Sequence, residues 1–268
     1  MRVKANCKIN LGLDILRRRE DGYHDLSTIM FPVSDLYDIV EVEPADTDSF
    51  HSTGLMIDCA DQDNICIKAL HLMRKHFNIG CATISLDKRV PFGAGLGGGS
   101  SDGTAVLIAL NEIFDLRLSE QQLIDLAAEL GSDTAFFVRN TPQLCEGRGE
   151  QMTPIALNLA GLWLAIIKPE VSVSTREAYA GVKPAIPEIP LQERINAPIN
   201  EWQNLIKNDF EKTIFALHPK LAEIKSDFIK AGAIYAAMSG SGSAMFALFD
   251  NEEAVNKIRN ATPYIFKL

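Results

Sequence analysis

Cysteine and histidine are scarce in this chain of 268 residues, and no stretch approaches the ~20 consecutive apolar residues of a membrane-spanning helix. The five cysteines are an odd number and form no C-x-x-C pair, which favours free thiols in a reducing cytoplasm over a disulfide framework. Among the five histidines, His71 and His76 lie five residues apart without an acidic companion, so we expect no metal site there. The first residues also lack the apolar centre and cleavage site of a secretory signal.

Basic residues are outnumbered, because 26 lysines and arginines face 35 aspartates and glutamates, for a formal net charge of −9. This balance argues against a protein that covers nucleic acid or an anionic membrane surface. A few lysines inside a cleft could still bind a small anion. We therefore expect small-molecule partners, no nucleic acid and no membrane. The apolar content of 47% is ordinary for a globular protein, and the length allows two modest domains.

No Gly-Lys pair occurs, so the Walker A phosphate loop is absent. Residues 91–103 nevertheless read PFGAGLGGGSSDG, with five glycines in seven positions, and an apolar pattern with helical spacing follows at once. Glycine permits close approach of a ligand to the backbone. The first amides of a helix lack intrahelical partners and lie at its positive end, so they attract anions. The segment is therefore interpreted as a phosphate-binding loop that opens a helix.

Two other interpretations of the glycine segment remain. Gly93, Gly95 and Gly98 satisfy G-x-G-x-x-G, and Asp115 lies near the spacing of a dinucleotide-binding fingerprint. That fingerprint needs a βαβ unit with parallel strands, whereas the segment after Asp115 opens another helix. A loop with a purely structural role stays open as the second alternative.

The hydrophobic pattern predicts an α+β fold, because strands and helices intermix without regular alternation. Alternating apolar residues predict a strand over 7–15, with Lys8, Asn10 and Asp14 on its other face. Asn64 precedes a helical pattern, Ser119 with Gln122 forms a capping box, and Gly131 suits a left-handed helix end. The apolar run 135–138 predicts a short strand. Further strands are expected over 161–169, 233–238 and 243–249, and the proline-rich segment 183–200 is expected to be extended.

Several smaller motifs are ordinary when each is taken alone. Asp133, in LGSDTAFFV, is typical of a turn or cap. Lys8 and Asn10 would by themselves indicate a solvated strand edge, and His24, in DGYHD, a surface turn. The SGSGS segment beginning at Ser239 suits any tight connection.

Their order along the chain is more specific. Five motifs follow one another along the chain: a Lys-x-Asn strand, a D-G-Y-H turn, GLGGGSS, L-G-x-D and S-G-S-G. In this order they resemble the motifs of the GHMP kinases, the family of galactose, homoserine, mevalonate and phosphomevalonate kinases. The D-G-Y-H turn and GLGGGSSD narrow the resemblance to members that act on a cytidylated sugar alcohol. The resemblance runs from Lys4 to about Phe249, leaving 183–200 and the last fifteen residues unmatched.

The resemblance implies a two-domain α+β kinase. A ribosomal-protein-like domain would span residues 1–155 and a ferredoxin-like domain residues 156–268, with the active site in the cleft between them. The reaction would move the γ-phosphate of ATP, with Mg²⁺, to a hydroxyl of the cytidylated alcohol, in isoprenoid precursor synthesis in the cytoplasm. The nucleotide residues would be Pro91, Phe92, Gly93, Ala94, Gly95, Leu96, Gly97, Gly98, Gly99, Ser100 and Ser101, with Asn64 and Lys88 near the adenine. Ser101 would also bind Mg²⁺, and Gly240, Ser241 and Gly242 would support the loop.

The resemblance also assigns the reacting groups. Asp133 would accept the proton of the attacking hydroxyl or only orient it, and Lys8 would keep Asp133 ionised and stabilise developing negative charge. The acceptor would be held by Asn10, Tyr23, His24, Thr175 and Tyr179. Gly103, early in the helix after the glycine segment, is expected to cost roughly 1 kcal/mol against alanine.

Overall fold

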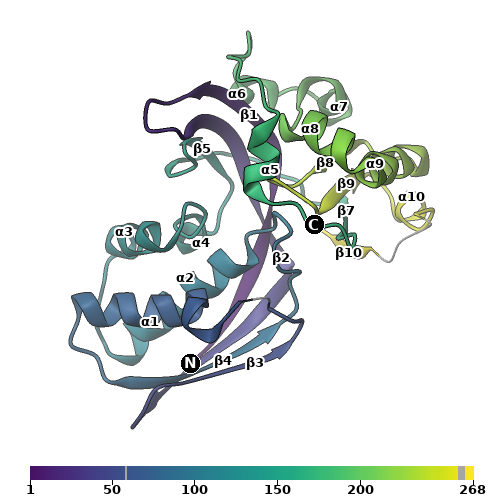
Figure 1. The fold of residues 1–268 in the computed structure, drawn as a ribbon. Coiled ribbons are helices and arrows are strands. Elements are labelled where there is room, and N and C mark those ends of the chain that lie inside the picture. Colours follow the sequence, from purple (N-terminus) through teal and green to yellow (C-terminus); the bar gives the residue numbers. More distant parts are fainter. Residues whose placement is uncertain (58, 259–262) are drawn as a thin grey trace. The chain divides into compact units, whose positions relative to one another are not determined.

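The computed structural model describes residues 1–57, 59–258 and 263–268 (Figure 1). Its contacts define two compact units, each assembled from separate segments. The first contains residues 1–8, 32–92 and 97–141, and the second contains 9–31, 93–96 and 142–268. Two long strands, β1 (Arg2–Arg18) and β2 (His24–Ala45), contribute to both units. The domain division at residue 155 stays a prediction.

The first unit places helices over a sheet (Figure 1). Strand β4 (Cys81–Lys88) pairs antiparallel with the second half of β2 and parallel with β3 (Ser49–Gly54). The side chains of β4 alternate between buried and half-buried, as expected for a sheet with one covered face. The helical elements are η1 (Asp61–Asp63), α1 (Ile65–His76), α2 (Gly98–Ile113), α3 (Glu120–Leu130) and α4 (Phe136–Arg139).

Local signals set the ends of two of these helices. Asn64 caps α1 by accepting the Cys66 amide at 2.9 Å, and the predicted capping box of Ser119 and Gln122 opens α3. The prediction for Gly131 was wrong, because this residue ends α3 with a φ of 173°, an extended conformation that any residue adopts.

The predicted strand over 135–138 was also wrong, because residues 136–139 form α4. Phe136 and Phe137 are buried there and pack edge to face, with ring centroids 5.0 Å apart. Asn140, with a φ of 52°, ends the helix and donates its N–H to the Phe136 carbonyl at 2.9 Å. Four apolar residues in a row fit either element, and only the tertiary surroundings decide.

Packing around Gly103 reverses the cost that helix propensity predicted for this residue. A Cβ at this position would lie 2.9 Å from Ile65 Cγ1, so glycine allows α1 and α2 to approach closely. We predict that Gly103→Ala lowers the free energy of unfolding by about 1–3 kcal/mol through overpacking, although alanine is the better helix former. Gly99→Ala in the same helix has no atom within 4 Å of the added carbon and should be neutral or stabilising. Urea denaturation of both variants tests this, and equal stabilities would contradict it.

The second unit contains two groups of paired strands. The first half of β2 pairs antiparallel with β5 (Gln143–Gly147), which pairs with β6 (Gln151–Pro154). An antiparallel sheet has the order β10-β7-β9-β8. Its strands are β7 (Trp163–Ile167), β8 (Tyr235–Met238), β9 (Met245–Phe249) and β10 (Tyr264–Lys267), of which the first three were predicted.

Helices cover this sheet and enclose an apolar core of aliphatic, aromatic and small residues, with two methionines (Figure 1). Phe228 of α9 and Phe249 of β9 are both fully buried and pack edge to face. Residues 183–200, predicted to be extended, contain the short helix α6 (Leu191–Arg194) and the start of the helical turn η2 (Ile199–Glu201). The helical elements are α5 (Thr175–Ala180), α6 (Leu191–Arg194), η2 (Ile199–Glu201), α7 (Trp202–Leu205), α8 (Phe210–Leu217), α9 (Pro219–Ala231) and α10 (Glu252–Val255).

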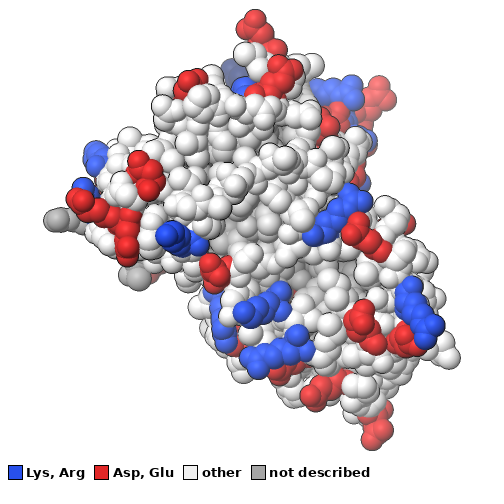
Figure 2. Space-filling model, turned by 180° about the vertical axis from the view of Figure 1, so that it is seen from behind, with Lys and Arg blue, Asp and Glu red and all other residues white. Residues whose placement is uncertain are grey.

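Charged side chains of both signs are interspersed on the face drawn in Figure 2. Exposed pairs such as Arg117 with Asp115, whose side chains are 81% and 72% exposed, contribute little stability because water screens them. None of the helices in the described part of the chain has the length and apolarity that a membrane crossing needs.

Candidate active site

The glycine segment has a distinctive backbone. Gly93, Gly95 and Gly97 have φ values of 61°, 76° and 70°, so every second residue occupies the left-handed region that favours glycine. Between them, Ala94 and Leu96 are buried and anchor the segment. Backbone that alternates in this way can turn successive N–H groups to one side and so form a concave anion site. Pro91 is buried before the segment, and Phe92 is 45% exposed.

Helix α2 begins at this segment with Gly97 as its N-cap. The Ser101 amide donates to the Gly97 carbonyl at 3.0 Å, the first bond of the helix, so the amides of Gly98, Gly99 and Ser100 precede the ladder. A Cβ at Gly93 or Gly99 would meet no atom within 4 Å, which shows open space beside the backbone. Free amides, the positive end of a helix and this space together fit the phosphates of a nucleotide.

The S-G-S-G loop holds the first part of the glycine segment in the second unit. The Ser239 hydroxyl donates to the Gly95 carbonyl at 2.9 Å, and the Ala244 amide donates to the Ala94 carbonyl at 3.0 Å. A Cβ at Gly95 would lie 2.1 Å from the Ser239 carbonyl oxygen, so glycine is required at this contact. Gly240 and Gly242 are buried between these two anchors, and Ser241 is half-buried.

Lys8 of β1 and Asp133 of the turn after α3 lie together in the first unit, although they are 125 positions apart in the sequence. Lys8 Nζ is 3.2 Å from Asp133 Oδ2, and the two side chains are 3% and 32% exposed. A Cβ at Gly97 would lie 3.0 Å from Lys8 Cγ and 3.1 Å from Lys8 Cε. The Lys8 side chain therefore runs against the start of α2, so the ion pair lies beside the free amides of that helix.

Lys88 is enclosed in the first unit by two carboxylates. Its ammonium lies 2.8 Å from Asp102 Oδ2 and contacts Asp38, and all three side chains are at most 2% exposed. Burial alone would lower the pKa of Lys88, but Asp102 and Asp38 outweigh it and raise that pKa. Burial raises the pKa of Asp102 well above its usual value, despite the attraction of Lys88. The Asp38 carboxylate also accepts the Val90 amide at 2.7 Å, so this cluster ties β2, β4 and α2 together.

Three predicted nucleotide or metal residues thus make contacts within the fold. Asn64 caps α1 and Lys88 belongs to the buried cluster, so a role for either near adenine stays a prediction. Ser101 is 3% exposed, and its role as a Mg²⁺ ligand also stays a prediction. Within residues 1–57, 59–258 and 263–268 no group of three or more His, Cys, Asp or Glu could hold a metal ion.

The aromatic residues predicted for the acceptor meet in the second unit. His24 stacks on Tyr179, with ring centroids 4.9 Å apart and planes 25° apart, and Tyr179 packs edge-on against Phe210 at 4.8 Å. Thr175 lies one turn before Tyr179 on α5 and is exposed. Tyr23 is 58% exposed. Tyr179 is half-buried among these rings, and aromatic side chains of this kind can stack on a nucleobase.

Asn10 is buried, contrary to the expectation of a solvated edge, and so is Lys8, because both are 2% exposed. Asn10 Nδ2 donates to Thr28 Oγ1 at 3.0 Å, and that hydroxyl donates to the Gly12 carbonyl at 2.5 Å. Alternation along the strand identified its two faces, but both faces are covered in the fold.

Two residues that the sequence analysis missed hold the S-G-S-G loop. Asn208 donates to the carbonyls of Met238 and Gly240, each at 2.8 Å, and is 3% exposed. Glu211 accepts the Met238 amide at 2.8 Å and pairs with Lys225 at 2.5 Å. The Asn-Asp pair at 208–209 was the only available signal, and before a helix it is typical of an ordinary cap.

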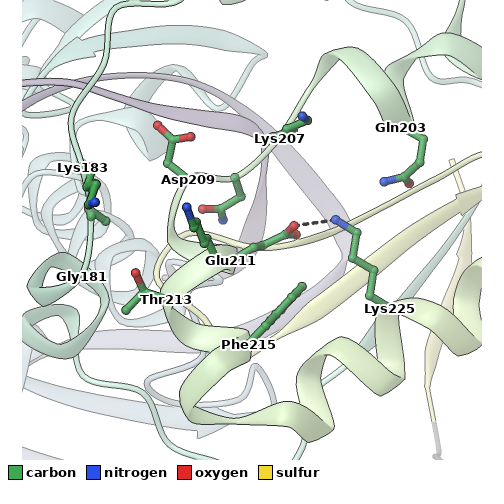
Figure 3. Close-up of a pocket in the computed structure, with 12 residues that line it drawn as sticks. Gly181, Lys183, Gln203, Lys207, Asp209, Glu211, Thr213, Phe215 and Lys225 are labelled. Carbon is green, nitrogen blue, oxygen red and sulfur yellow. Dashed lines mark hydrogen bonds and ion pairs between the residues drawn. The ribbon is translucent and has the colours of Figure 1, made fainter.

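Both residues line a cavity of about 720 Å³ in the second unit. Figure 3 shows Lys225 reaching from α9 to Glu211 on α8, and Lys183, Lys207 and Asp209 around the same cavity. None of the residues predicted for catalysis or binding lines it. Asn208 and Glu211 therefore line this cavity and also hold the S-G-S-G loop that contacts the glycine segment.

The site combines a helix start suited to anions, a buried ammonium and a solvent-accessible carboxylate. Enzymes that transfer a phosphoryl group to an alcohol use groups of these kinds. Two family models match the chain, one described as the GHMP kinases N terminal domain over residues 64–141 and the other as GHMP kinases C terminal over 191–266. The chain belongs to the GHMP kinase family, and the predicted two-domain α+β architecture is confirmed. The C-terminal match also includes 191–200 and much of the tail, which the sequence analysis had left outside the resemblance.

Curated relatives are more specific. The chain is 48% identical to the 4-diphosphocytidyl-2-C-methyl-D-erythritol kinase of Bacteroides thetaiotaomicron, over 92% of this chain and 91% of that one. It is 43% identical to the kinase of the same name from Bacteroides fragilis, over 98% and 97% of the two chains.

Solved structures agree with these relatives. A crystal structure of 4-(cytidine 5'-diphospho)-2C-methyl-D-erythritol kinase matches with a TM-score of 0.84 and 32% identity, over 99% of this chain and 98% of that one. Homoserine kinase from Cytophaga hutchinsonii, at 19% identity and a TM-score of 0.69, covers 99% and 93% and shares the fold alone. As a GHMP kinase, the chain uses ATP as its phosphoryl donor.

Proposed function

We propose that this chain transfers the γ-phosphate of ATP to the 2-hydroxyl of 4-diphosphocytidyl-2-C-methyl-D-erythritol, giving the 2-phosphate and ADP. The step belongs to the non-mevalonate synthesis of isopentenyl diphosphate. The observation that carries the proposal is the Lys8–Asp133 pair at 3.2 Å beside the free amides that open α2. The near full-length relatives named for this substrate support the choice of acceptor.

The glycine segment would bind the triphosphate. The amides of Gly98, Gly99 and Ser100 precede the helix ladder and would donate to the β- and γ-phosphate oxygens. Mg²⁺ bound with the nucleotide would neutralise phosphate charge, with Ser101 as its nearest proposed protein ligand. The S-G-S-G loop, through Ser239 and Ala244, would keep the segment in shape before the nucleotide arrives.

Asp133 would act on the acceptor hydroxyl. Its half-exposed carboxylate can accept a hydrogen bond from that hydroxyl and so aim an oxygen lone pair at the γ-phosphorus. The proton passes to this carboxylate as the new O–P bond forms and the bond to ADP breaks. Lys8 would hold Asp133 in place and offset negative charge on the transferring group.

The aromatic group of the second unit would select the cytidine end. Tyr179, already stacked on His24 and supported edge-on by Phe210, offers a fixed platform for the cytosine. Asn10, Tyr23 and Thr175 would complete the acceptor site. Homoserine and mevalonate have no base to stack, so this group would favour the cytidylated alcohol over them.

The test is an ADP-release assay with ATP and Mg²⁺ and three separate acceptors. We expect turnover with 4-diphosphocytidyl-2-C-methyl-D-erythritol, none above background with homoserine or mevalonate, and loss of turnover when EDTA removes the metal. ³¹P NMR of the product should show a new phosphomonoester. Turnover with homoserine or mevalonate, and none with the cytidylated alcohol, would overturn the proposed substrate.

Asn208→Ala should raise the KM for ATP about tenfold and change the KM for the acceptor less. The substitution leaves the buried carbonyls of Met238 and Gly240 without their donor, at a cost of about 1–3 kcal/mol, and loosens the loop that holds Gly95. Steady-state kinetics and urea denaturation measure the two effects separately. Asn204→Ala, an exposed asparagine in α7, is the matched control. A loss of stability with an unchanged KM for ATP would leave Asn208 a purely structural role.

A further inference from the structure

Strand register places one exposed arginine beside the D-G-Y-H turn. In the second unit β5 pairs with β2 so that Gly147 lies opposite Leu26. The β5–β6 turn at 148–150 therefore extends beyond Leu26 toward the residues that precede it in the chain. The turn is closed locally, because the Arg148 amide donates to Glu150 Oε2 at 2.6 Å and Gly149 has a φ of 110°. These contacts order the backbone of the turn from which the exposed Arg148 side chain extends.

The Arg148 guanidinium covers one face of a predicted acceptor residue. Its central carbon lies 5.1 Å from the centroid of the Tyr23 ring, within the range of a cation–π contact. Tyr23 is otherwise 58% exposed, and its amide donates to Asp21 Oδ1 at 3.1 Å, which orients the backbone of the turn. A guanidinium that stacks through its flat face keeps its N–H groups in the plane, where they can bind a phosphate by its edge.

The carboxylates around this turn form their direct ion pairs with arginines other than Arg148. Arg17 pairs with Asp25, and Arg19 pairs with both Asp25 and Asp21, so these two carboxylates already have guanidinium partners. The carboxylate of Glu150 accepts the backbone amide of Arg148. In the part of the chain that the structure describes, no ion pair uses the Arg148 side chain. Arg148 attracts the Asp21 carboxylate through space, but its guanidinium N–H groups are not engaged in an ion pair among the described residues.

We propose that Arg148 is an acceptor-binding residue that holds Tyr23 by stacking and donates its N–H groups to the diphosphate of the substrate. This inference rests on the proposed function, because it requires an acceptor that carries a diphosphate next to a base. It gives the chain a basis for preferring diphosphate-bearing cytidine compounds to cytidine itself. An unstacked arginine at the tip of a hairpin, solvated and without a ligand, is the alternative that the test must exclude.

The test compares Arg148→Gln with Arg148→Lys and with Arg117→Gln, which removes an exposed arginine from the loop before α3. We expect Arg148→Gln to raise the acceptor KM about 5- to 20-fold, with kcat and the KM for ATP changed less than twofold. Arg148→Lys, which keeps the charge without the flat face, should fall between Arg148→Gln and the wild type. Arg117→Gln should match the wild type.

Two probes separate a phosphate contact from a general loss of structure. With a non-hydrolysable ATP analogue in place, calorimetry should show that Arg148→Gln weakens CDP binding by a similar 5- to 20-fold and cytidine binding by about twofold. Added salt should weaken CDP binding to the wild type more than to this variant. Equal effects on CDP and cytidine, or wild-type kinetics in Arg148→Gln, would overturn the inference. Failure of the proposed function would instead appear as a wild-type enzyme without turnover on the cytidylated alcohol.

Discussion

Asp133→Asn is expected to lower kcat by about 10²-fold or more and to leave ATP binding nearly intact. Asparagine has the shape of aspartate and can still contact Lys8 through its carbonyl oxygen, so the fold is preserved. It cannot take the hydroxyl proton, and it removes the negative charge 3.2 Å from the ammonium of Lys8, whose side chain is 3% exposed. Single-turnover kinetics and ATP titration measure the two quantities independently.

The matched control for this substitution is Asp125→Asn in α3 of the same unit. Asp125 is exposed and accepts a hydrogen bond from the Gln121 side chain at 2.9 Å, so its loss should change neither quantity. Near-normal turnover in Asp133→Asn would remove this residue from the chemistry. A variant with lost ATP binding as well would indicate that Asp133 shapes the nucleotide site.

Gly97→Val should weaken nucleotide binding and lower kcat/KM for ATP by about 10²-fold. Gly97 has a φ of 70°, which costs a residue with a side chain roughly 1–2 kcal/mol. The new Cβ would also lie 3.0 Å from Lys8 Cγ and from the Phe137 ring, so Lys8 must move away from the start of α2. The substitution therefore disturbs both the amides at the start of α2 and the position of Lys8. Gly97→Ala should show a smaller loss in the same direction.

Gly161→Val separates backbone strain from displacement of Lys8. Gly161 has a φ of 90°, and a Cβ there would meet no atom within 4 Å. This control should lose some thermal stability and keep its kinetics below the unfolding temperature. If Gly97→Val is folded by circular dichroism and binds ATP normally, the glycine segment does not hold the nucleotide.

Local signals in the sequence predicted the parts of the fold that depend on neighbours along the chain. Asn64 and Ser119 begin their helices as expected, because a cap acts on amides two or three residues away. The glycine segment was identified from its composition, because five glycines in seven positions suit close approach of a ligand to the backbone. The short strand β10 was missed and the helix α4 was predicted as a strand, because four residues carry too little periodicity.

Long-range contacts explain the remaining differences. Alternation along β1 separated Lys8 from its apolar neighbours, but only the tertiary fold shows that both faces are covered. Helix propensity predicted that Gly103 destabilises α2, but the contact with Ile65 of α1 leaves room for no larger side chain there. Asn208 supports a loop 30 residues further on, and nothing near it in sequence indicates that partner. The resemblance to a family supplied the pairing of Lys8 with Asp133, which periodicity could not.

A crystal structure with a non-hydrolysable ATP analogue and 4-diphosphocytidyl-2-C-methyl-D-erythritol would test the whole arrangement most directly. The account predicts the γ-phosphate within hydrogen-bonding distance of the amides of Gly98, Gly99 and Ser100, and the 2-hydroxyl within hydrogen-bonding distance of the Asp133 carboxylate. A triphosphate bound away from these amides, or an acceptor hydroxyl out of reach of Asp133, would contradict it.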